Sequence, residues 1–221
     1  AVVYLSDTVP DVFAQKLRHK GAEVVRAGRD YEASMQAAAD TAHEKGWTLL
    51  SDSSWPGYFD LPHRLMEGYL AMAAEATRQM PEPPTHILLQ AGVGGLAGAC
   101  AAWFRHVWGD APQIIVVEPE AAPALIDSIK AGHVVDTDGP VSNMGRLDCK
   151  TPSLIALKGL ARDADAFVTI RDAQASAVLP HLAAQGLATT ESGAAGLAAL
   201  GEMDLSADAR VLCIISEEAE A

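Results

Sequence analysis

The feature of the sequence that most constrains its fold is a glycine-rich turn between an apolar stretch and a run of helix formers. The apolar stretch His86–Gln90 reads HILLQ, and Gly92, Gly94 and Gly95 follow before the helix-forming segment LAGACAAW. This order predicts a buried strand, a tight turn and a helix that runs to about Val107. Glycines let the backbone approach an oxygen-rich ligand, and the N–H groups at a helix start bind phosphate. The turn therefore predicts a phosphate site.

Strand and helix patterns alternate along the rest of the chain, which is typical of parallel sheets covered by helices. We expect an α/β fold with two open, mostly parallel sheets flanked by helices. Residues 1–52 are expected to form the remnant of a small α/β domain, with a strand at Thr48–Leu50, and residues 53–221 a large one. The polar and aromatic segment Ser51–Leu61 would cross between the two domains. Residues 133–151 are expected to form a long irregular loop, and such loops are usually functional or mobile.

Charge and composition exclude several classes of partner. The chain has 221 residues and a formal net charge of −13, which argues against nucleic acid and against an anionic membrane surface. No apolar run is long enough to cross a bilayer, and no signal peptide is visible. Three cysteines without a C-x-x-C pair favour a reducing compartment, so we expect a cytoplasmic protein. The histidines show no ligand spacing, so no metal site is expected.

The glycine turn is compatible with two ligands, or with none. Gly92, Gly94 and Ala97 match the G-x-G-x-x-G/A pattern of dinucleotide sites, and Glu118 ends the next strand, where a ribose-binding acid belongs. Pyridoxal phosphate is the second ligand, because its single phosphate fits a short glycine cluster. The third interpretation is a strand–helix junction without a ligand. Glycines argue against it, because they destabilise such a junction unless close backbone approach is needed.

Further motifs follow one another in a characteristic order. They read AVVYLSDTVP, GAEVVRAG, LLSDSSWPGY, QAGVGGLAGA, VVEPE, RLDCKTPS, TTESGAAGL and VLCIIS. In this order the chain resembles the pyridoxal-phosphate enzymes of the tryptophan-synthase β-subunit fold (fold type II). Among them it is most similar to the diaminopropionate ammonia-lyases. The DSSWPGY and RLDCKTPS segments favour that branch over threonine dehydratase and cysteine synthase.

The resemblance implies a function. It implies pyridoxal 5′-phosphate as the cofactor, held in the cleft between the two domains, and a small amino acid as the substrate. The reaction would be the α,β-elimination of ammonia from a small diamino acid, giving pyruvate and ammonia, in a homodimer. Two alternatives stay open, namely a serine or threonine dehydratase and a non-catalytic module that binds phosphate or a nucleotide.

The resemblance also implies roles for individual residues. The hydroxyl of Ser216 would face the pyridine nitrogen of the cofactor, and Asp52 would be the acid/base that takes the α-proton of the substrate. A loop-capping aspartate is the alternative for Asp52. The residues whose N–H groups would hold the cofactor phosphate are Gly92, Val93, Gly94, Gly95 and Leu96.

Other polar residues near these motifs have two interpretations each. We expect Glu118 to be a structural acid that pairs with neighbouring N–H groups rather than a catalyst. Asp148–Lys150 would lie near the substrate, or else in a mobile surface loop. The Ser192–Gly193 step would pack a helix closely against the cofactor, or else reflect ordinary N-capping by Thr190 or Glu191.

One element that the resemblance requires does not occur in the chain. Such enzymes bind their cofactor covalently through a lysine in an S-x-K context, on a helix before the strand that matches Ala1–Leu5, and an Asn-containing loop follows it. None of the six lysines has this context. We therefore expect roughly a hundred further residues upstream of Ala1 and no activity of this chain alone. A shortened relative that cannot perform the chemistry is the alternative.

Overall fold

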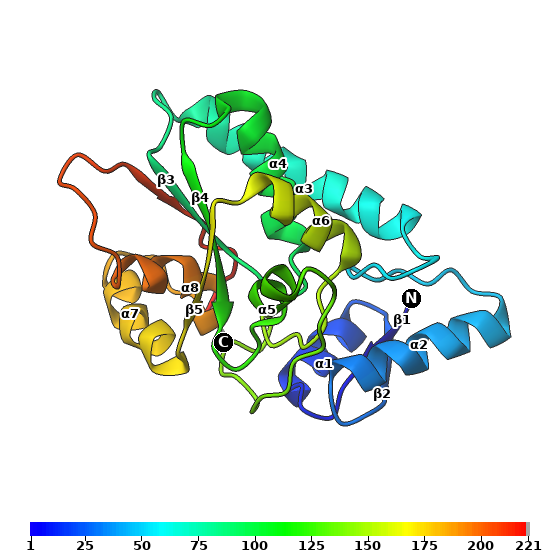
Figure 1. Cartoon of the computed structure of the whole chain (residues 1–221). Coiled ribbons are helices and arrows are strands. Elements are labelled where there is room, and N and C mark those ends of the chain that lie inside the picture. Colours follow the sequence, from blue (N-terminus) through cyan, green and yellow to red (C-terminus); the bar gives the residue numbers. More distant parts are fainter. Residues whose placement is uncertain (220–221) are drawn as a thin grey trace. The chain divides into compact units, whose positions relative to one another are not determined.

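The computed structural model describes residues 1–219 of the chain (Figure 1). Its contacts divide the chain into two compact units, Ala1–Ser51 and Asp52–Ala221. The division falls one residue before the expected boundary, and whether each unit is a domain that folds on its own stays a prediction. The expected fold class is confirmed, because both units contain parallel strands flanked by helices.

The first unit contains a two-stranded parallel sheet with two helices. Its elements are β1 (Val2–Leu5), α1 (Asp11–His19), β2 (Glu23–Arg26) and α2 (Tyr31–Lys45). Asp30 caps α2, since its carboxylate accepts a hydrogen bond of 2.9 Å from the backbone N–H of Ala33. Among the described residues of this unit, the buried hydrophobic side chains are Ala14 and Ala42. The unit therefore has a small apolar core.

The expected strand at Thr48–Leu50 is wrong, because the segment has no regular structure. A strand needs a neighbour for its backbone N–H and C=O groups, and β1 and β2 pair only with each other among the described residues. Leu50 is 67% exposed. Trp47 instead contacts the end of α2, because the Lys45 ammonium lies 4.6 Å from the centre of the Trp47 ring. An apolar triplet without a sheet edge to join remains irregular.

The second unit contains a four-stranded parallel sheet in the order β5-β4-β3-β6. Its elements are α3 (Asp60–Gln79), β3 (His86–Gln90), α4 (Gly95–Trp108), β4 (Gln113–Pro119), α5 (Ala124–Ala131), α6 (Leu154–Asp163), β5 (Ala166–Ile170), α7 (Asp172–Ala184), α8 (Glu191–Leu200) and β6 (Val211–Cys213). From β3 the sheet grows through β4 to β5, and the chain then returns to add β6 on the other side of β3. The strand order thus reverses between β3 and β6. In open α/β sheets, ligands bind at the carboxyl ends of the strands beside such a reversal.

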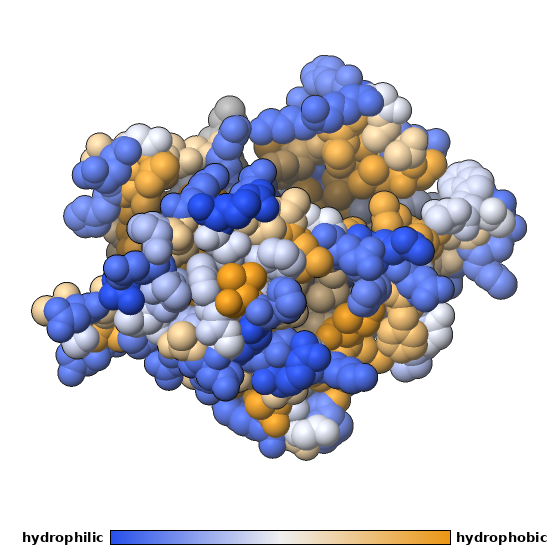
Figure 2. All heavy atoms as spheres, turned by 90° about the horizontal axis from the view of Figure 1, so that it is seen from above, coloured by the Kyte–Doolittle hydropathy of each residue, from blue (hydrophilic) through white to orange (hydrophobic). Residues whose placement is uncertain are grey.

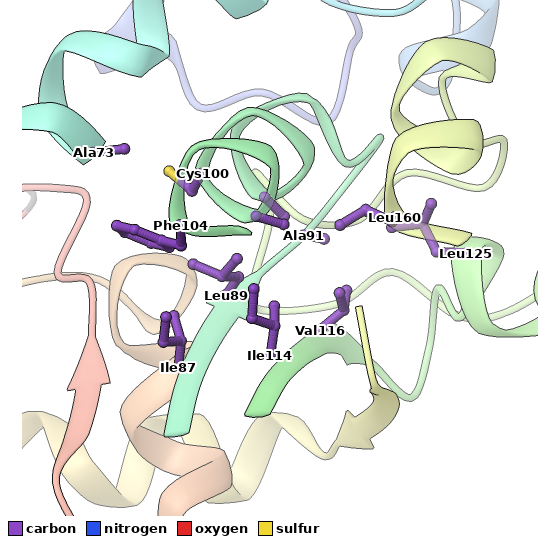
Figure 3. Packing of buried hydrophobic residues seen from close by; sticks show 12 residues of the cluster. Ala73, Ile87, Leu89, Ala91, Cys100, Phe104, Ile114, Val116, Leu125 and Leu160 are labelled. Atoms are coloured by element: carbon purple, nitrogen blue, oxygen red, sulfur yellow. The ribbon is translucent and has the colours of Figure 1, made fainter. Parts of the chain in front are cut away.

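The core of this unit lies on both faces of the sheet. Because successive side chains of a strand point to opposite faces, Ile87 and Leu89 pack with Phe104 of α4 on one face (Figure 3). Leu88 points to the other face and clusters with Ala195 of α8. Figure 1 shows α3, α4 and α6 on the first face and α7 and α8 on the second. The parallel pairing of β3 with β6 places their carboxyl ends side by side between these layers.

The surface carries polar and apolar residues in alternation. On the face that Figure 2 presents, hydrophilic residues are widely spread and hydrophobic ones form smaller groups among them. Within residues 1–219, no helix combines the length and the hydrophobicity needed to span a membrane. The same residues contain no group of three or more His, Cys, Asp or Glu side chains placed to hold a metal ion.

Candidate functional site

The glycine turn opens α4 at the carboxyl end of β3. Gly94 is the N-cap of this helix and has a φ of +96°, a left-handed conformation that residues with a Cβ rarely adopt. As a glycine, this N-cap residue has no side chain that could cap the start of α4. The first N–H groups of a helix have no acceptor within it, and with the helix dipole they form a site for an anion. The start of α4 is therefore suited to hold a phosphate.

Neighbouring segments approach the turn so closely that a side chain would collide with backbone at Gly92 and would displace its neighbours at Gly94. A Cβ added to Gly92 would lie 2.9 Å from the carbonyl oxygen of Arg146 and 3.1 Å from Cys149 Sγ. A Cβ added to Gly94 would lie 3.1 Å from both Ala156 Cβ and Leu125 Cδ1. Both glycines are thus needed for close packing of the loop 133–151 and of helices α5 and α6 around the turn.

The end of the loop 133–151, at Asp148–Lys150, is packed rather than loose. Cys149 is buried, and the Lys150 ammonium donates hydrogen bonds to the carbonyl oxygens of Ala121 at 2.7 Å and Pro140 at 3.1 Å. Its third acceptor is Asp148 Oδ1 at 2.6 Å. The alternative of a mobile surface loop does not fit these contacts. A role near the substrate stays a prediction for Asp148–Lys150.

Ser216 lies beside the turn because β6 pairs with β3. The connection runs through Gln90, whose Nε2 donates hydrogen bonds to Ile214 O at 2.8 Å and to Ser216 Oγ at 3.2 Å. Ser216 itself is exposed, so its hydroxyl is accessible at the carboxyl edge of the sheet. Sequence reasoning missed Gln90. Its signal is a polar residue that ends an apolar strand immediately before the glycine turn.

Asp52 also lies beside the turn, next to Gly95. Its backbone oxygen is 3.7 Å, and Tyr69 Cε2 is 3.9 Å, from the position that a Cβ on Gly95 would occupy. The Asp52 side chain is exposed. Burial raises the pKa of the Tyr69 phenol, and the negative charge of Asp52 raises it further. The structure thus brings Asp52 and the turn together. Nothing in the sequence marks Tyr69 as a site residue, because it is one aromatic residue within a long helix.

Two buried serines hold the segment that carries Asp52. The hydroxyls of Ser54 and Ser153 lie 2.7 Å apart, and Ser54 Oγ also accepts a hydrogen bond of 2.9 Å from the N–H of Ile155 at the start of α6. The N–H of Ser153 donates to the carbonyl oxygen of Val93 at 3.0 Å. These bonds join the Asp52 segment, α6 and the glycine turn into one structure.

Glu118 has a structural role, as expected. Its side chain is fully buried, and its two carboxylate oxygens accept hydrogen bonds from the N–H groups of Leu125 at 2.7 Å and Ile126 at 2.8 Å. Burial raises the pKa of this carboxyl to about 7, although both hydrogen bonds act in the opposite direction. With both oxygens engaged at the start of α5, Glu118 is not placed to bind a ribose.

At the start of α8 the structure shows ordinary N-capping by Thr190. Thr190 is its N-cap, and the hydroxyl of Thr190 accepts a hydrogen bond of 3.1 Å from the N–H of Gly193. Close packing of α8 is also present, but against the sheet, since a Cβ added to Gly196 would lie 3.2 Å from the carbonyl oxygen of Leu88. Contact of Ser192–Gly193 with a cofactor stays a prediction.

Comparison with known proteins identifies relatives over nearly the whole chain. A family profile described as pyridoxal-phosphate dependent enzyme matches residues 1–217. A diaminopropionate ammonia-lyase of Salmonella typhimurium strain LT2 is 33% identical over 98% of this chain and 60% of its own. The chain therefore spans about 60% of the length of that relative.

Solved structures of an ammonia-lyase agree with this match. The diaminopropionate ammonia-lyase of Escherichia coli in complex with D-serine has a TM-score of 0.91 and 28% identity, over 99% of this chain and 60% of that one. The same enzyme in complex with an aminoacrylate-PLP azomethine reaction intermediate has a TM-score of 0.90 at 28% identity, over 99% of this chain and 61% of that one. The fold match is therefore as extensive as the sequence match.

Proposed function

Because the chain belongs to the family of pyridoxal-phosphate dependent enzymes, we propose that the complete protein is an ammonia-lyase of small diamino acids. Its reaction is the α,β-elimination of ammonia from a substrate such as diaminopropionate, which gives pyruvate and a second ammonia after hydrolysis. The similarity to diaminopropionate ammonia-lyases over 98% of this chain supports this choice of substrate. A homodimer in the cytoplasm is part of the same proposal.

The observation that carries the proposal is the glycine N-cap of α4 at the strand reversal. Gly94 has no side chain to cap the helix and is left-handed, and the neighbouring carboxyl edge carries Ser216. These residues fit pyridoxal phosphate, because backbone N–H groups bind its phosphate in a chain of net charge −13 without a basic side chain. When bound, this cofactor withdraws electrons from the α-carbon of an amino acid.

The remaining site residues have distinct tasks. The hydroxyl of Ser216 hydrogen-bonds the pyridine nitrogen, and Asp52 accepts the α-proton of the substrate on its carboxylate. Tyr69 lies beside the same turn and contributes a phenol, and burial and the charge of Asp52 raise the pKa of this phenol and favour its neutral form. Lys150 is engaged by Asp148 and two carbonyl oxygens, and none of the six lysines has the S-x-K context of the lysine that binds the cofactor covalently. We assign it to the complete protein and expect residues 1–221 alone to be inactive.

A substrate comparison on the complete protein tests this proposal. Ammonia and pyruvate should form from diaminopropionate and not from serine or threonine, and Asp52→Asn should lower kcat at least a hundredfold, as expected for loss of a general base. Release of ammonia from serine or threonine alone would favour a dehydratase instead. If NAD but not pyridoxal phosphate raised the melting temperature, the chain would be a nucleotide-binding module and the proposal would fail.

A further inference from the structure

The side-chain amide of Gln90 is held in one orientation by its neighbours. Gln90 is 4% exposed, and its Nε2 faces the carbonyl oxygens of Ile214 at 2.8 Å and of Gly193 at 3.3 Å. Backbone carbonyl oxygens accept hydrogen bonds and cannot donate them. An amide turned by 180° would place its own oxygen against these two acceptors. The amide nitrogen must therefore occupy this position.

This orientation has an unfavourable consequence for the amide oxygen of Gln90. Oε1 is buried and has no hydrogen-bond partner among the described residues. It lies against α8, where a Cβ added to Gly196 would be 3.1 Å away. A buried polar atom without a partner is unfavourable, so its presence calls for a compensating gain. A hydrophobic residue at this position would fill the space between β3 and α8 without that cost.

The orientation of Gln90 determines the direction of the Ser216 hydroxyl. Nε2 and Ser216 Oγ are 3.2 Å apart, and an amide nitrogen donates but does not accept. Ser216 therefore receives this hydrogen bond on its oxygen. Its own proton must point to another acceptor, and Ser216 lies exposed at the carboxyl edge of the sheet beside the glycine turn.

We propose that Gln90 is a positioning residue that makes Ser216 a hydrogen-bond donor toward the pyridine nitrogen of the cofactor and so keeps that nitrogen unprotonated. The inference rests on the proposed function, since it assumes that the cofactor binds beside Ser216. A hydroxyl alone could donate to the ring nitrogen or accept from its protonated form. Gln90 favours the first possibility, because its amide nitrogen offers no acceptor to the Ser216 proton, whereas an unprotonated ring nitrogen does.

The protonation of the ring nitrogen can be measured directly. The complete protein is loaded with pyridoxamine 5′-phosphate that carries ¹⁵N in the ring, and the ¹⁵N chemical shift is followed from pH 6 to 9. In Gln90→Glu, either protonation state of the introduced carboxyl offers an oxygen to the Ser216 proton. The hydroxyl then reverses, and we expect the protonated fraction of the ring nitrogen to rise at least tenfold. Gln113→Glu is the matched control, since Gln113 is exposed at the opposite end of the neighbouring strand β4.

Two further variants separate positioning from a structural effect. Gln90→Met removes the donor without adding an acceptor, so the ring nitrogen should become more protonated by a smaller factor. In a Ser216→Ala background, Gln90→Glu should shift the titration no further, because its effect passes through the hydroxyl. Thermal unfolding of each variant verifies its fold. If Gln90→Glu does not fold, Gln90→Met carries the test.

The outcomes distinguish the two proposals. An unchanged ¹⁵N titration in a folded Gln90 variant that binds the compound overturns the inference and leaves the proposed function standing. An equal shift with and without the Ser216 hydroxyl also overturns it, since the effect would then be a general one of charge. If the unaltered protein does not bind the labelled compound, the proposed function fails and the inference fails with it.

Discussion

At the residue scale, Glu118 makes the stability of the chain depend on pH. Burial raises the pKa of this carboxyl to about 7 in the folded state, whereas a carboxyl in an unfolded chain titrates near about 4.3. The folded state therefore holds the proton more tightly than the unfolded state. The stabilisation that this provides is complete below about pH 4 and is lost as the pH rises through about 7.

Replacement of Glu118 by Gln should remove this dependence. Between pH 5 and pH 8 the unaltered chain is expected to lose roughly 2 kcal/mol more of its free energy of unfolding than the Glu118→Gln variant does. Urea denaturation at several pH values measures the difference. Glu120→Gln is the control, because Glu120 is exposed and lies two residues away. Parallel pH profiles of the chain and the Glu118 variant would contradict the prediction.

The second residue whose effect we predict is Gly94, in the turn itself. Gly94→Ala imposes a left-handed conformation on alanine, which costs about 1–2 kcal/mol, and places a Cβ 3.1 Å from Leu125 and Ala156. With the cost of overpacking, the expected loss in free energy of unfolding is roughly 3 kcal/mol. Gly132→Ala separates the cost of the left-handed conformation from the cost of overpacking. Gly132 has a φ of +72°, but no atom lies within 4 Å of the Cβ that alanine would add there. Equal losses in both variants would show that the turn is not closely packed.

At the element scale, Ser54 couples a loop to the start of α6. In Ser54→Ala the half-buried N–H of Ile155 loses its acceptor, and the Ser153 hydroxyl loses the Ser54 hydroxyl but keeps the N–H of Ser54, so we expect a loss of roughly 1–2 kcal/mol in the free energy of unfolding. Chemical denaturation measures it. Ser206→Ala is the control, because Ser206 is exposed and, within residues 1–219, the hydrogen bond that it forms is one that its backbone oxygen accepts. A loss below the error of the control would mean that water replaces the hydroxyl.

Sequence patterns predict a helix or strand when the residues that specify it lie within the element or directly beside it. The strand His86–Gln90 has the expected bounds, since its apolar run and the glycines after it specify it within a few residues. The prediction of a strand at Thr48–Leu50 is wrong, because a strand depends on a neighbouring strand that local composition does not reveal. The pairs Ser54–Ser153 and Gln90–Ser216 are separated by 99 and 126 residues, so only the folded sheet brings them together.

At the scale of the whole molecule, topology explains why the site residues meet. The glycine turn and Ser216 follow different strands, β3 and β6, which become neighbours because the chain reverses its direction of sheet growth. A parallel sheet places all its carboxyl ends at one edge, so polar residues after each strand gather there. The resemblance to a known family predicted these residues individually, and the strand order supplies the physical reason for their proximity.

The two units should differ in local stability. The buried hydrophobic residues of Ala1–Ser51 are two alanines, whereas Asp52–Ala221 buries large side chains such as Phe104, Ile87 and Ile114. Because stabilisation scales with the apolar area removed from water, we expect amides of β1 and α2 to exchange hydrogen through openings of lower free energy than amides of β3 and β4. Hydrogen exchange followed by mass spectrometry of peptides from each element measures this difference.

Mild urea provides the control for that experiment. If the units open separately, low urea should accelerate exchange in residues 1–51 before it affects β3 and β4, because the smaller unit has less free energy of unfolding to lose. Equal protection in both units, or one common response to urea, would mean that the chain unfolds as a single cooperative structure. Its first fifty residues would then owe their stability to the larger unit rather than to their own core.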